Sequence, residues 1–311
     1  MQLTQWIQDS AARFDSRSRL LGWGRTVIAG AELSVLLAST NNTLFFSGPI
    51  LSENASCTGL RTAGLWCITG VDGAGSQAGR LLAVGVLVAV AVGFSPRWTC
   101  IPHWYVAFSM ATRITALDGG EQVAEIATML LIPICWGDRR TWQWQTPDGQ
   151  LPATWRGSSF AAWLLLRLQV CVIYTDAALS KLRFPSWRDG NALPTILDGP
   201  QFGLPGYLRG LLDPLLVHAW IGRTMTWSVL ALELCLAASM LAATRVRRAL
   251  LVPGICLHLS IIICMGLVSF GLIMIGTLML TCLRTPGAGS AFGIRLRPVH
   301  REDQLAELSA R

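Results

Sequence analysis

Apolar residues fall in eight long blocks along the chain rather than in the amphipathic stripes of soluble helices. The blocks cover residues 22–41, 79–96, 99–116, 122–137, 158–182, 224–243, 249–267 and 268–283. A run of about 20 apolar residues forms a helix that crosses the ~30 Å hydrocarbon layer of a membrane. Helices are favoured there because lipid offers no partner to open backbone groups. The pattern therefore predicts an all-α, polytopic transmembrane helical bundle of about eight spans.

The last two blocks form one uncharged run from Ala249 to Leu283, which is too long for a single span at about 1.5 Å per residue. We expect the break between them at Ser269–Gly271. The predicted organisation is then a cytoplasmic segment 1–21, a transmembrane domain 22–283 and a basic cytoplasmic tail 284–311. Within the domain, residues 42–78 and 183–223 form outer loops, and the second of these caps the outer face.

Composition and charge agree with a membrane protein. Of the 311 residues, 52% are hydrophobic and 14% are charged, whereas soluble domains average about 25% charged residues. The mean hydropathy is +0.48. The net charge of +7 favours a lipid bilayer over nucleic acid as the partner, because the basic residues stand at block ends. With the N-terminus inside, the inner segments hold twice as many Lys and Arg as the outer ones, so both termini are expected in the cytoplasm.

The fifth block carries the most informative polar pattern. On a helix, one stripe collects Arg167, Cys171, Tyr174, Ala178 and Lys181. Gln169 and Asp176 form a second polar stripe seven residues apart. Ionisable groups inside a bilayer cost a few kcal/mol, so they usually pair or line a cavity. Arg167 and Asp176 are therefore candidates for a substrate site or cavity.

Lys181 is the only lysine among 25 basic residues. One interpretation is that its amine snorkels to water at the outer end of the span. The other is catalytic: a lysine in a dry pocket loses its proton readily and acts as a base. The lone lysine in an arginine-rich chain favours the second interpretation.

Glu233 and His258 lie in the sixth and seventh blocks, each surrounded by apolar residues. We expect a Glu–His hydrogen bond between the two helices. Its role is either to hold the two helices together or to transfer a proton. Glu121 follows the sequence LDGG, so it is expected at a helix N-terminus, where the helix dipole favours a carboxylate.

Cys57 and Cys67 lie in the same predicted outer loop, and a disulfide between them suits an oxidising compartment. The other seven cysteines lie in or beside hydrophobic blocks and resemble small apolar residues. The sequence contains no metal-ligand spacing, no phosphate-binding loop and no dinucleotide fingerprint, so we expect no metal site.

Two segments carry a family resemblance. Residues 168–193 resemble the HTTM domain shared with vitamin K-dependent γ-carboxylases through Tyr174, Lys181–Leu182, Trp187 and Asp189–Gly190. Glu233, Arg245–Arg248, His258 and Ser269–Phe270 follow the same pattern in order. This resemblance implies Lys181 as the base that deprotonates a reduced quinone, although the large lumenal domain of the carboxylases has no counterpart here.

Residues 93–144 resemble the sporulation-delaying protein B family more specifically. The matching motifs are His103–Tyr105 with Ser109, Asp118–Gln122, Leu130–Cys135 and Asp138–Trp144. Gln143 stands where the family tends to have histidine. The cysteines in the first outer loop also fit the family pattern.

The second resemblance implies a role in maturing a secreted antimicrobial peptide, with the peptide precursor and a small accessory protein of the same operon as partners. The catalytic candidates are Lys181, Tyr174, His258 and Glu233. The candidates for substrate binding or a cavity are Arg167, Asp176, Trp187, His103, Asp118 and Gln122.

Three functional hypotheses stay open at this point. The first is a membrane factor for peptide maturation or export. The second is a quinone-dependent enzyme with Lys181 as base and Tyr174 as its hydrogen-bond partner. The third is a non-catalytic immunity protein, scaffold or small transporter. A transporter is disfavoured because the sequence has no internal repeat.

Overall fold

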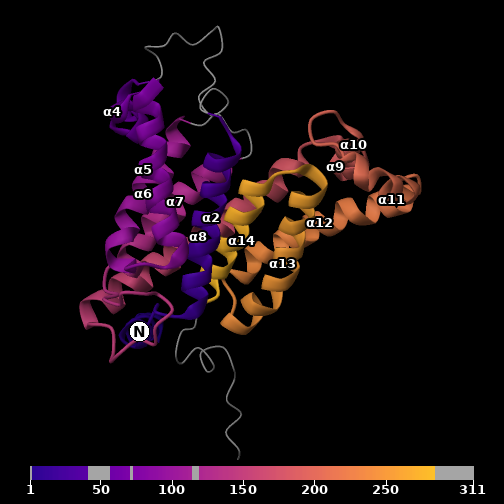
Figure 1. Ribbon diagram of the computed structural model, residues 1–311. Coiled ribbons are helices and arrows are strands. Elements are labelled where there is room, and N and C mark those ends of the chain that lie inside the picture. The colour runs from indigo at the N-terminus through magenta and orange to yellow at the C-terminus, as the bar shows by residue number, and fades with distance from the viewer. Residues whose placement is uncertain (1, 41–56, 71–72, 114–118, 284–311) are drawn as a thin grey trace, which may run out of the picture.

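The computed structural model describes residues 2–40, 57–70, 73–113 and 119–283, which fold into helices and loops without a strand (Figure 1). The helices in chain order are α1 Gln2–Arg13, α2 Arg19–Ala38, the 3-10 helix η2 Gly59–Ala63, α4 Leu65–Thr69, α5 Gly73–Val92, α6 Pro96–Arg113, α7 Gly120–Cys135, α8 Ala153–Leu182, α9 Pro185–Arg188, α10 Ala192–Asp198, α11 Gly206–Leu216, α12 Ala219–Ser239, α13 Thr244–Met265 and α14 Val268–Thr281. Each hydrophobic block coincides with one long helix. The all-α prediction is therefore confirmed.

Five of the described helices are long and apolar enough to cross a membrane: α2, α5, α8, α12 and α13. Helix α14 is also apolar but has only 14 residues, about 21 Å at about 1.5 Å per residue. The chain is therefore a membrane protein with several candidate spans. The expected number of eight spans stays a prediction.

The break between α13 and α14 lies at Gly266–Leu267, so the predicted break at Ser269–Gly271 is wrong. Gly266 has φ of 73°, in the left-handed region that glycine enters without the steric cost of a side chain. It ends α13, and the chain re-enters a helix at Val268. Ser269–Gly271 instead lie in the first turn of α14.

The centre of the bundle is the crossing of α2 and α14. Two glycines face each other there: a Cβ on Gly24 would stand 3.1 Å from the Gly276 carbonyl oxygen, and one on Gly276 would stand 2.9 Å from the Gly24 carbonyl oxygen. Small residues let membrane helices approach this closely. Helix α14 also contacts α7, α8 and α13, so most of its residues are buried despite its short length.

The two ends of the bundle differ in what they carry. We call one the disulfide end, because it holds the Cys57–Cys67 disulfide, α4 and the short helices α9 to α11 (Figure 1). We call the opposite end the tryptophan end, because it holds the loop 136–152 with Trp142 and Trp144. Helix α8 runs from the tryptophan end to the disulfide end.

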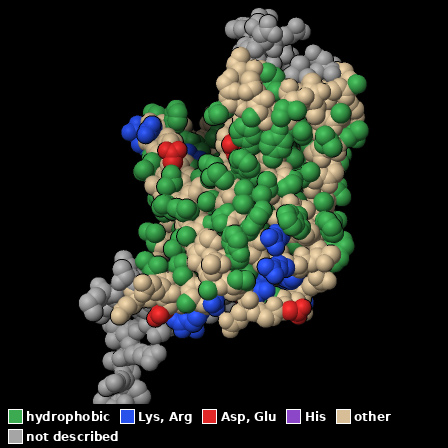
Figure 2. Space-filling view, turned by 90° about the vertical axis from the view of Figure 1, so that its left-hand side faces the viewer, with side chains coloured by type: hydrophobic (Ala, Val, Ile, Leu, Met, Phe, Trp, Pro, Cys, Tyr) green, Lys and Arg blue, Asp and Glu red, His purple; other side chains and the backbone are tan. Residues whose placement is uncertain are grey.

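The surface between the two ends is largely apolar. Figure 2 shows hydrophobic side chains over the middle of one face and most of its Lys and Arg side chains toward the lower end. Exposed large apolar side chains on the candidate spans include Leu81, Val88, Leu165, Val172, Trp227, Leu234, Val252 and Leu259. An apolar belt of this size would promote aggregation in water and is the expected surface for contact with lipid.

Candidate functional site

Three helices bring the four catalytic candidates together. Tyr174 and Lys181 come from α8, two turns apart on one face, while Glu233 comes from α12 and His258 from α13. The Lys181 Nζ donates to Glu233 Oε1 at 2.6 Å. The Tyr174 hydroxyl and His258 Nε2 are hydrogen-bonded at 2.7 Å. We call these four residues the polar cluster.

The two pairs of the polar cluster lie along one face of α8. Tyr174 and Lys181 are seven residues apart on that face and bind His258 of α13 and Glu233 of α12. The His258 ring packs edge-on against Phe270 of α14, with ring centroids 5.7 Å apart. The cluster is therefore one site, with an aromatic wall on the α14 side.

Trp187 of α9 covers the Lys181 amine. The Nζ atom lies 5.5 Å from the centroid of the Trp187 ring, within the range of a cation–π contact. Trp187 packs in turn with Ala178, Ala192 and Leu230, which joins α8, α10 and α12 beneath the disulfide end. The Lys181 side chain keeps 27% of its surface exposed, so the cluster is covered but is not sealed from solvent.

The predicted hydrogen bond between Glu233 and His258 is wrong. Each side chain has a different partner on α8, because that helix lies against α12 and presents Lys181 and Tyr174 to the same space. Glu233 Oε2 and His258 Nδ1 are buried and have no hydrogen-bond partner among the described residues. A buried polar atom without a partner costs about 1–3 kcal/mol, so these two atoms are available to bind a further group.

The cluster combines four groups that transfer or share protons: an amine, a carboxylate, a phenol and an imidazole. In each pair the donor and acceptor are at hydrogen-bond distance, which is the first requirement for proton transfer. The Tyr174 hydroxyl bonds to His258 rather than to Lys181. If Lys181 acts as a base, the direct hydrogen-bond partner of its amine is therefore Glu233 and not Tyr174.

Arg167 is not part of the polar cluster, although it shares the stripe on α8 and lies two turns before Tyr174. Its guanidinium donates to the Met240 carbonyl oxygen at the end of α12 and stacks on Trp163, 4.8 Å from the ring centroid. Arg247 stacks on the same ring at 5.2 Å and donates to the Thr281 carbonyl oxygen. Cations stabilise the negative ends of helices, so these arginines bind the helix ends at the tryptophan end.

Trp163 is a structural residue of this region that the sequence analysis missed. Its indole N–H donates to the Leu280 carbonyl oxygen, and its ring contacts both Arg167 and Arg247. The available signal was its spacing of four residues from Arg167, which places both on one side of a helix.

His103 belongs to a separate buried pair. Its Nε2 atom lies 2.8 Å from Glu32 Oε2, and the two side chains are only 1% and 2% exposed. The pair joins α6 to α2, in the half of the bundle that also contains α5 and α7. His103 and the polar cluster therefore do not share a site.

The remaining candidates are not part of the cluster. Asp176 is exposed on α8, and Gln169, its partner in the predicted second stripe, is half-buried. Gln122 is exposed in the first turn of α7, whereas its neighbour Glu121 is buried there at the predicted helix N-terminus. Asp118 lies outside the described residues.

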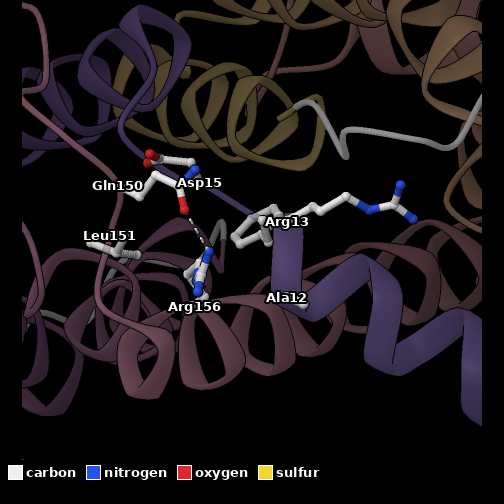
Figure 3. Close-up of a pocket in the computed structure, with 7 residues that line it drawn as sticks. Ala12, Arg13, Asp15, Gln150, Leu151 and Arg156 are labelled. Carbon is white, nitrogen blue, oxygen red and sulfur yellow. Dashed lines mark hydrogen bonds between the residues drawn. The ribbon is translucent and has the colours of Figure 1, made fainter.

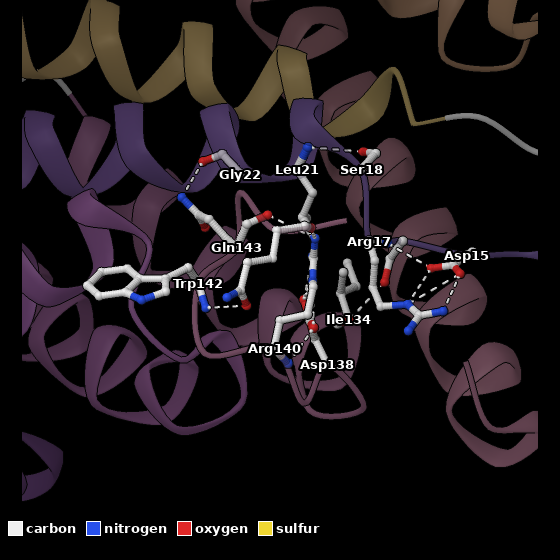
Figure 4. A network of polar contacts seen from close by, with 12 residues as sticks. Asp15, Arg17, Ser18, Leu21, Gly22, Ile134, Asp138, Arg140, Trp142 and Gln143 are labelled. Carbon is white, nitrogen blue, oxygen red and sulfur yellow. Dashed lines mark hydrogen bonds and ion pairs between the residues drawn. The ribbon is translucent and has the colours of Figure 1, made fainter. Parts of the chain in front are cut away.

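The motif at Asp138–Trp144 fixes a loop at the tryptophan end (Figure 4). Asp138 accepts two hydrogen bonds from the Arg140 guanidinium, and Arg140 also donates to the Gln143 carbonyl oxygen. The Gln143 side chain accepts from the buried Arg25 at 2.9 Å and donates to the Gly22 carbonyl oxygen. The motif therefore joins the loop 136–152 to α2, which is a structural role.

Cys57 and Cys67 form a disulfide, with Cα atoms 5.8 Å apart. It closes the short segment that contains η2 and begins α4. The Leu65 amide, at the start of α4, donates to Ser109 of α6, and the Tyr105 hydroxyl of α6 donates to the Ala63 carbonyl oxygen. These contacts hold the cysteine segment against the bundle.

A cavity of about 270 Å³ lies at the tryptophan end (Figure 3). Its lining residues are Ala12, Arg13, Phe14, Asp15, Gln150, Leu151 and Arg156. Arg156 and Lys181 are separated by 25 residues of α8, about 37 Å at about 1.5 Å per residue. The cavity is therefore remote from the polar cluster, and none of the predicted site residues lines it.

Among the described residues, no group of three or more His, Cys, Asp or Glu side chains is placed to hold a metal ion. No family model matches the chain, and no solved structure matches it. The resemblance to the HTTM domain of the carboxylases therefore stays a prediction.

Two bacterial proteins are similar over most of their length. Sporulation-delaying protein SdpB of Bacillus subtilis (strain 168) is 34% identical over 257 residues, covering 82% of this chain and 78% of SdpB. The uncharacterized protein YitO of the same organism is 28% identical over 278 residues, covering 88% of this chain and 89% of YitO. The chain therefore belongs to the family of the sporulation-delaying protein SdpB.

Proposed function

We propose that this chain is a membrane factor for the maturation or export of a secreted antimicrobial peptide of the sporulation-delaying type. The polar cluster is the site at which it acts on the peptide. Its partners are the secreted precursor and a small accessory protein. The name of the relative SdpB and the membrane character of the chain support the pathway.

The observation that supports this site is that two hydrogen-bonded pairs lie together within the bundle. The Lys181–Glu233 pair and the Tyr174–His258 pair meet at the junction of α8, α12 and α13. Glu233 Oε2 and His258 Nδ1 supply two buried positions for hydrogen bonds to a substrate. Each of these atoms costs about 1–3 kcal/mol when it is buried alone, and a hydrogen bond to a bound substrate would remove that cost.

The proposal includes a topology in which the disulfide end faces outward and both termini face the cytoplasm. Basic side chains gather toward the lower end in Figure 2, as the positive-inside rule expects. A disulfide also suits an oxidising exterior. The polar cluster, beneath α9 and α10, then lies near the side on which a secreted peptide is processed.

The test is the mass spectrum of the secreted peptide from cells with and without the gene, followed by variants of Lys181. We expect Lys181→Met to abolish the mature mass while the chain stays in the membrane fraction. The matched control is Arg183→Met, which removes an exposed cation two residues away and leaves maturation intact. Normal maturation by Lys181→Met would reject the proposed site.

Lys181→Arg separates two roles of the amine. Arginine keeps a positive charge beside Glu233 but does not deprotonate in proteins. We expect this variant to fold normally and to remain inactive if the amine transfers a proton. Full activity would mean that pairing with Glu233 is the only requirement, and the quinone-type base hypothesis would then be excluded.

A further inference from the structure

Helix α11, Gly206–Leu216, has no buried residue. Figure 1 shows it projecting sideways from the bundle on the side of α12. Among the helices of the described chain, its main neighbour is α12, which follows it directly. An exposed helix of this length is marginal on its own in water, so something other than protein packing has to stabilise it.

The pattern of α11 is strongly amphipathic. Apolar side chains on one broad face belong to Tyr207, Leu208, Leu211, Leu212, Leu215 and Leu216. The opposite face holds Gly206, Arg209, Gly210 and Asp213. Tyr207, Leu211 and Leu215 are 75%, 67% and 46% exposed, so much of the apolar face is uncovered within the described chain. A helix with one charged face and one uncovered apolar face is suited to the surface of a bilayer.

The position of α11 agrees with this interpretation. The Tyr207 hydroxyl donates to the carbonyl oxygen of Ile263, in the last turn of the candidate span α13. The start of α11 therefore lies at the level where a span ends, which is the boundary between lipid and water. Trp220, exposed at the beginning of α12, gives the segment a second aromatic anchor at that boundary.

The neighbouring candidate spans also expose apolar side chains. Trp227 of α12 and Ile263 of α13 are exposed on candidate spans. On the polar side, Arg209 bonds to Asp198 of α10 at 3.4 Å and to the Leu204 carbonyl oxygen. We propose that α11 lies in the headgroup region of the bilayer, with its apolar face against the acyl chains.

This inference is independent of the peptide pathway and adds a role for the segment 199–218. Helix α10, to which Arg209 is bonded, packs with Trp187 over the polar cluster. Lipid contact at α11 would therefore hold the cover of the polar cluster at the membrane surface.

The experiment compares two adjacent positions on opposite faces of α11. Leu211→Cys and Gly210→Cys each receive a nitroxide label in a background with serine at Cys171, Cys235, Cys256 and Cys264, and the chain is reconstituted in phosphatidylcholine–phosphatidylglycerol vesicles. A side chain at Gly210 meets no atom within 4 Å, so this matched control fits without strain. The measurement is the accessibility of each nitroxide to two relaxation reagents: oxygen, which partitions into lipid, and a water-soluble nickel chelate. We expect the accessibility to oxygen to exceed that to the chelate several-fold at Leu211→Cys, and the reverse at Gly210→Cys.

Two outcomes would overturn the proposal. Equal access of the nickel chelate to both positions would place α11 in water. Exclusion of both reagents from Leu211→Cys would mean that protein covers the apolar face. A second measurement uses the unaltered chain in vesicles with a photoactivatable acyl-chain diazirine: we expect cross-links within 207–216, and their absence there, with cross-links on α13 as the control, would reject lipid contact.

Discussion

Each half of the bundle buries an ionisable pair, but the surroundings of the two pairs differ. Glu32 and His103 are almost completely buried, and within the described chain each is the hydrogen-bond partner of the other. Lys181 and Glu233 lie beside a second pair, beneath an aromatic side chain, with the amine partly exposed. Glu233 also keeps an oxygen that has no partner in the described part of the chain. A closed pair connects helices, whereas an open pair with unpartnered atoms is equipped to bind and act on another molecule.

The comparison matters because burial alone does not separate the two roles. Both pairs remove ionisable groups from water, and such groups are costly inside membranes wherever they occur. The separating features are the remaining hydrogen-bonding capacity and a route to solvent. Both features favour the polar cluster over the Glu32–His103 pair as the active site.

The largest expected effect is on activity, and it tests whether the two ionisable pairs have different roles. Glu233→Gln removes one charge while keeping the side-chain shape, and we expect the mature peptide to fall by at least about 100-fold, the low end of proton-transfer contributions. Glu32→Gln is the matched change in the closed pair and should leave maturation within about twofold, because a neutral hydrogen bond to His103 remains. Quantitative mass spectrometry, normalised to chain in the membrane fraction, measures both. Equal losses would mean that the two pairs have the same role.

The second prediction sharpens the comparison through stability. Glu32→Leu leaves the buried His103 imidazole without an acceptor, and we expect a loss of about 1–3 kcal/mol in the free energy of unfolding. For a chain of this size, that lowers the melting temperature by several degrees. Thermal unfolding in nanodiscs measures the shift, with Glu32→Gln as the control that keeps an acceptor. An unchanged melting temperature would show that the closed pair does not stabilise the helices.

The third prediction concerns the cover of the polar cluster. Lys181 is the only lysine, so an amine-reactive ester reports on this side chain and the N-terminus alone, which peptide mapping separates. We expect Trp187→Ala to increase the labelling rate of Lys181 by roughly twofold to fivefold, the factor for losing a cation–π contact of about 0.5–1 kcal/mol. Trp98→Ala, at an exposed tryptophan of α6 in the other half of the bundle, is the control. A membrane-impermeant ester added to intact cells also tests whether the disulfide end faces outward.

The smallest expected effect comes from the Asp15–Arg17 ion pair, which lies outside the predicted spans and serves as a reference for the two buried pairs. Partial burial works to raise the pKa of Asp15, but hydrogen bonds from the Arg17 side chain and amide outweigh it and lower the pKa below its usual range. A lowered pKa means that the stabilisation is present above the ordinary value of about 4 and is lost as the pH falls through the folded value. Because Asp15 is 37% exposed, we expect less than about 1 kcal/mol.

The measurement for this ion pair is the difference in melting temperature between the unaltered chain and Asp15→Asn. It should be positive near neutral pH and should shrink as the medium is acidified through the lowered pKa. A difference that grows on acidification would contradict the assignment of the shift to Arg17.

The sequence by itself determined the elements of this protein. Apolar runs and the need to pair every backbone group in lipid predict helices at all eight blocks, and the structure places a helix at each. Tyr174 and Lys181 share a helix face because their spacing fixes it, and Glu121 sits at a helix N-terminus because of the preceding glycines. These properties depend on a few neighbouring residues, so a single chain is enough to predict them.

Only the tertiary structure decided which groups meet. Glu233 pairs with Lys181, and His258 with Tyr174, because the order and rotation of α8, α12 and α13 bring these faces together. Arg167 shares a stripe with Lys181 but binds helix ends about 21 Å away along α8. The apolar pattern of a helix shows that its faces avoid water. It does not show which neighbouring helix packs against each face, because lipid and other helices are equally apolar. The partners are set instead by close contacts such as Gly24 against Gly276, which join segments about 250 residues apart.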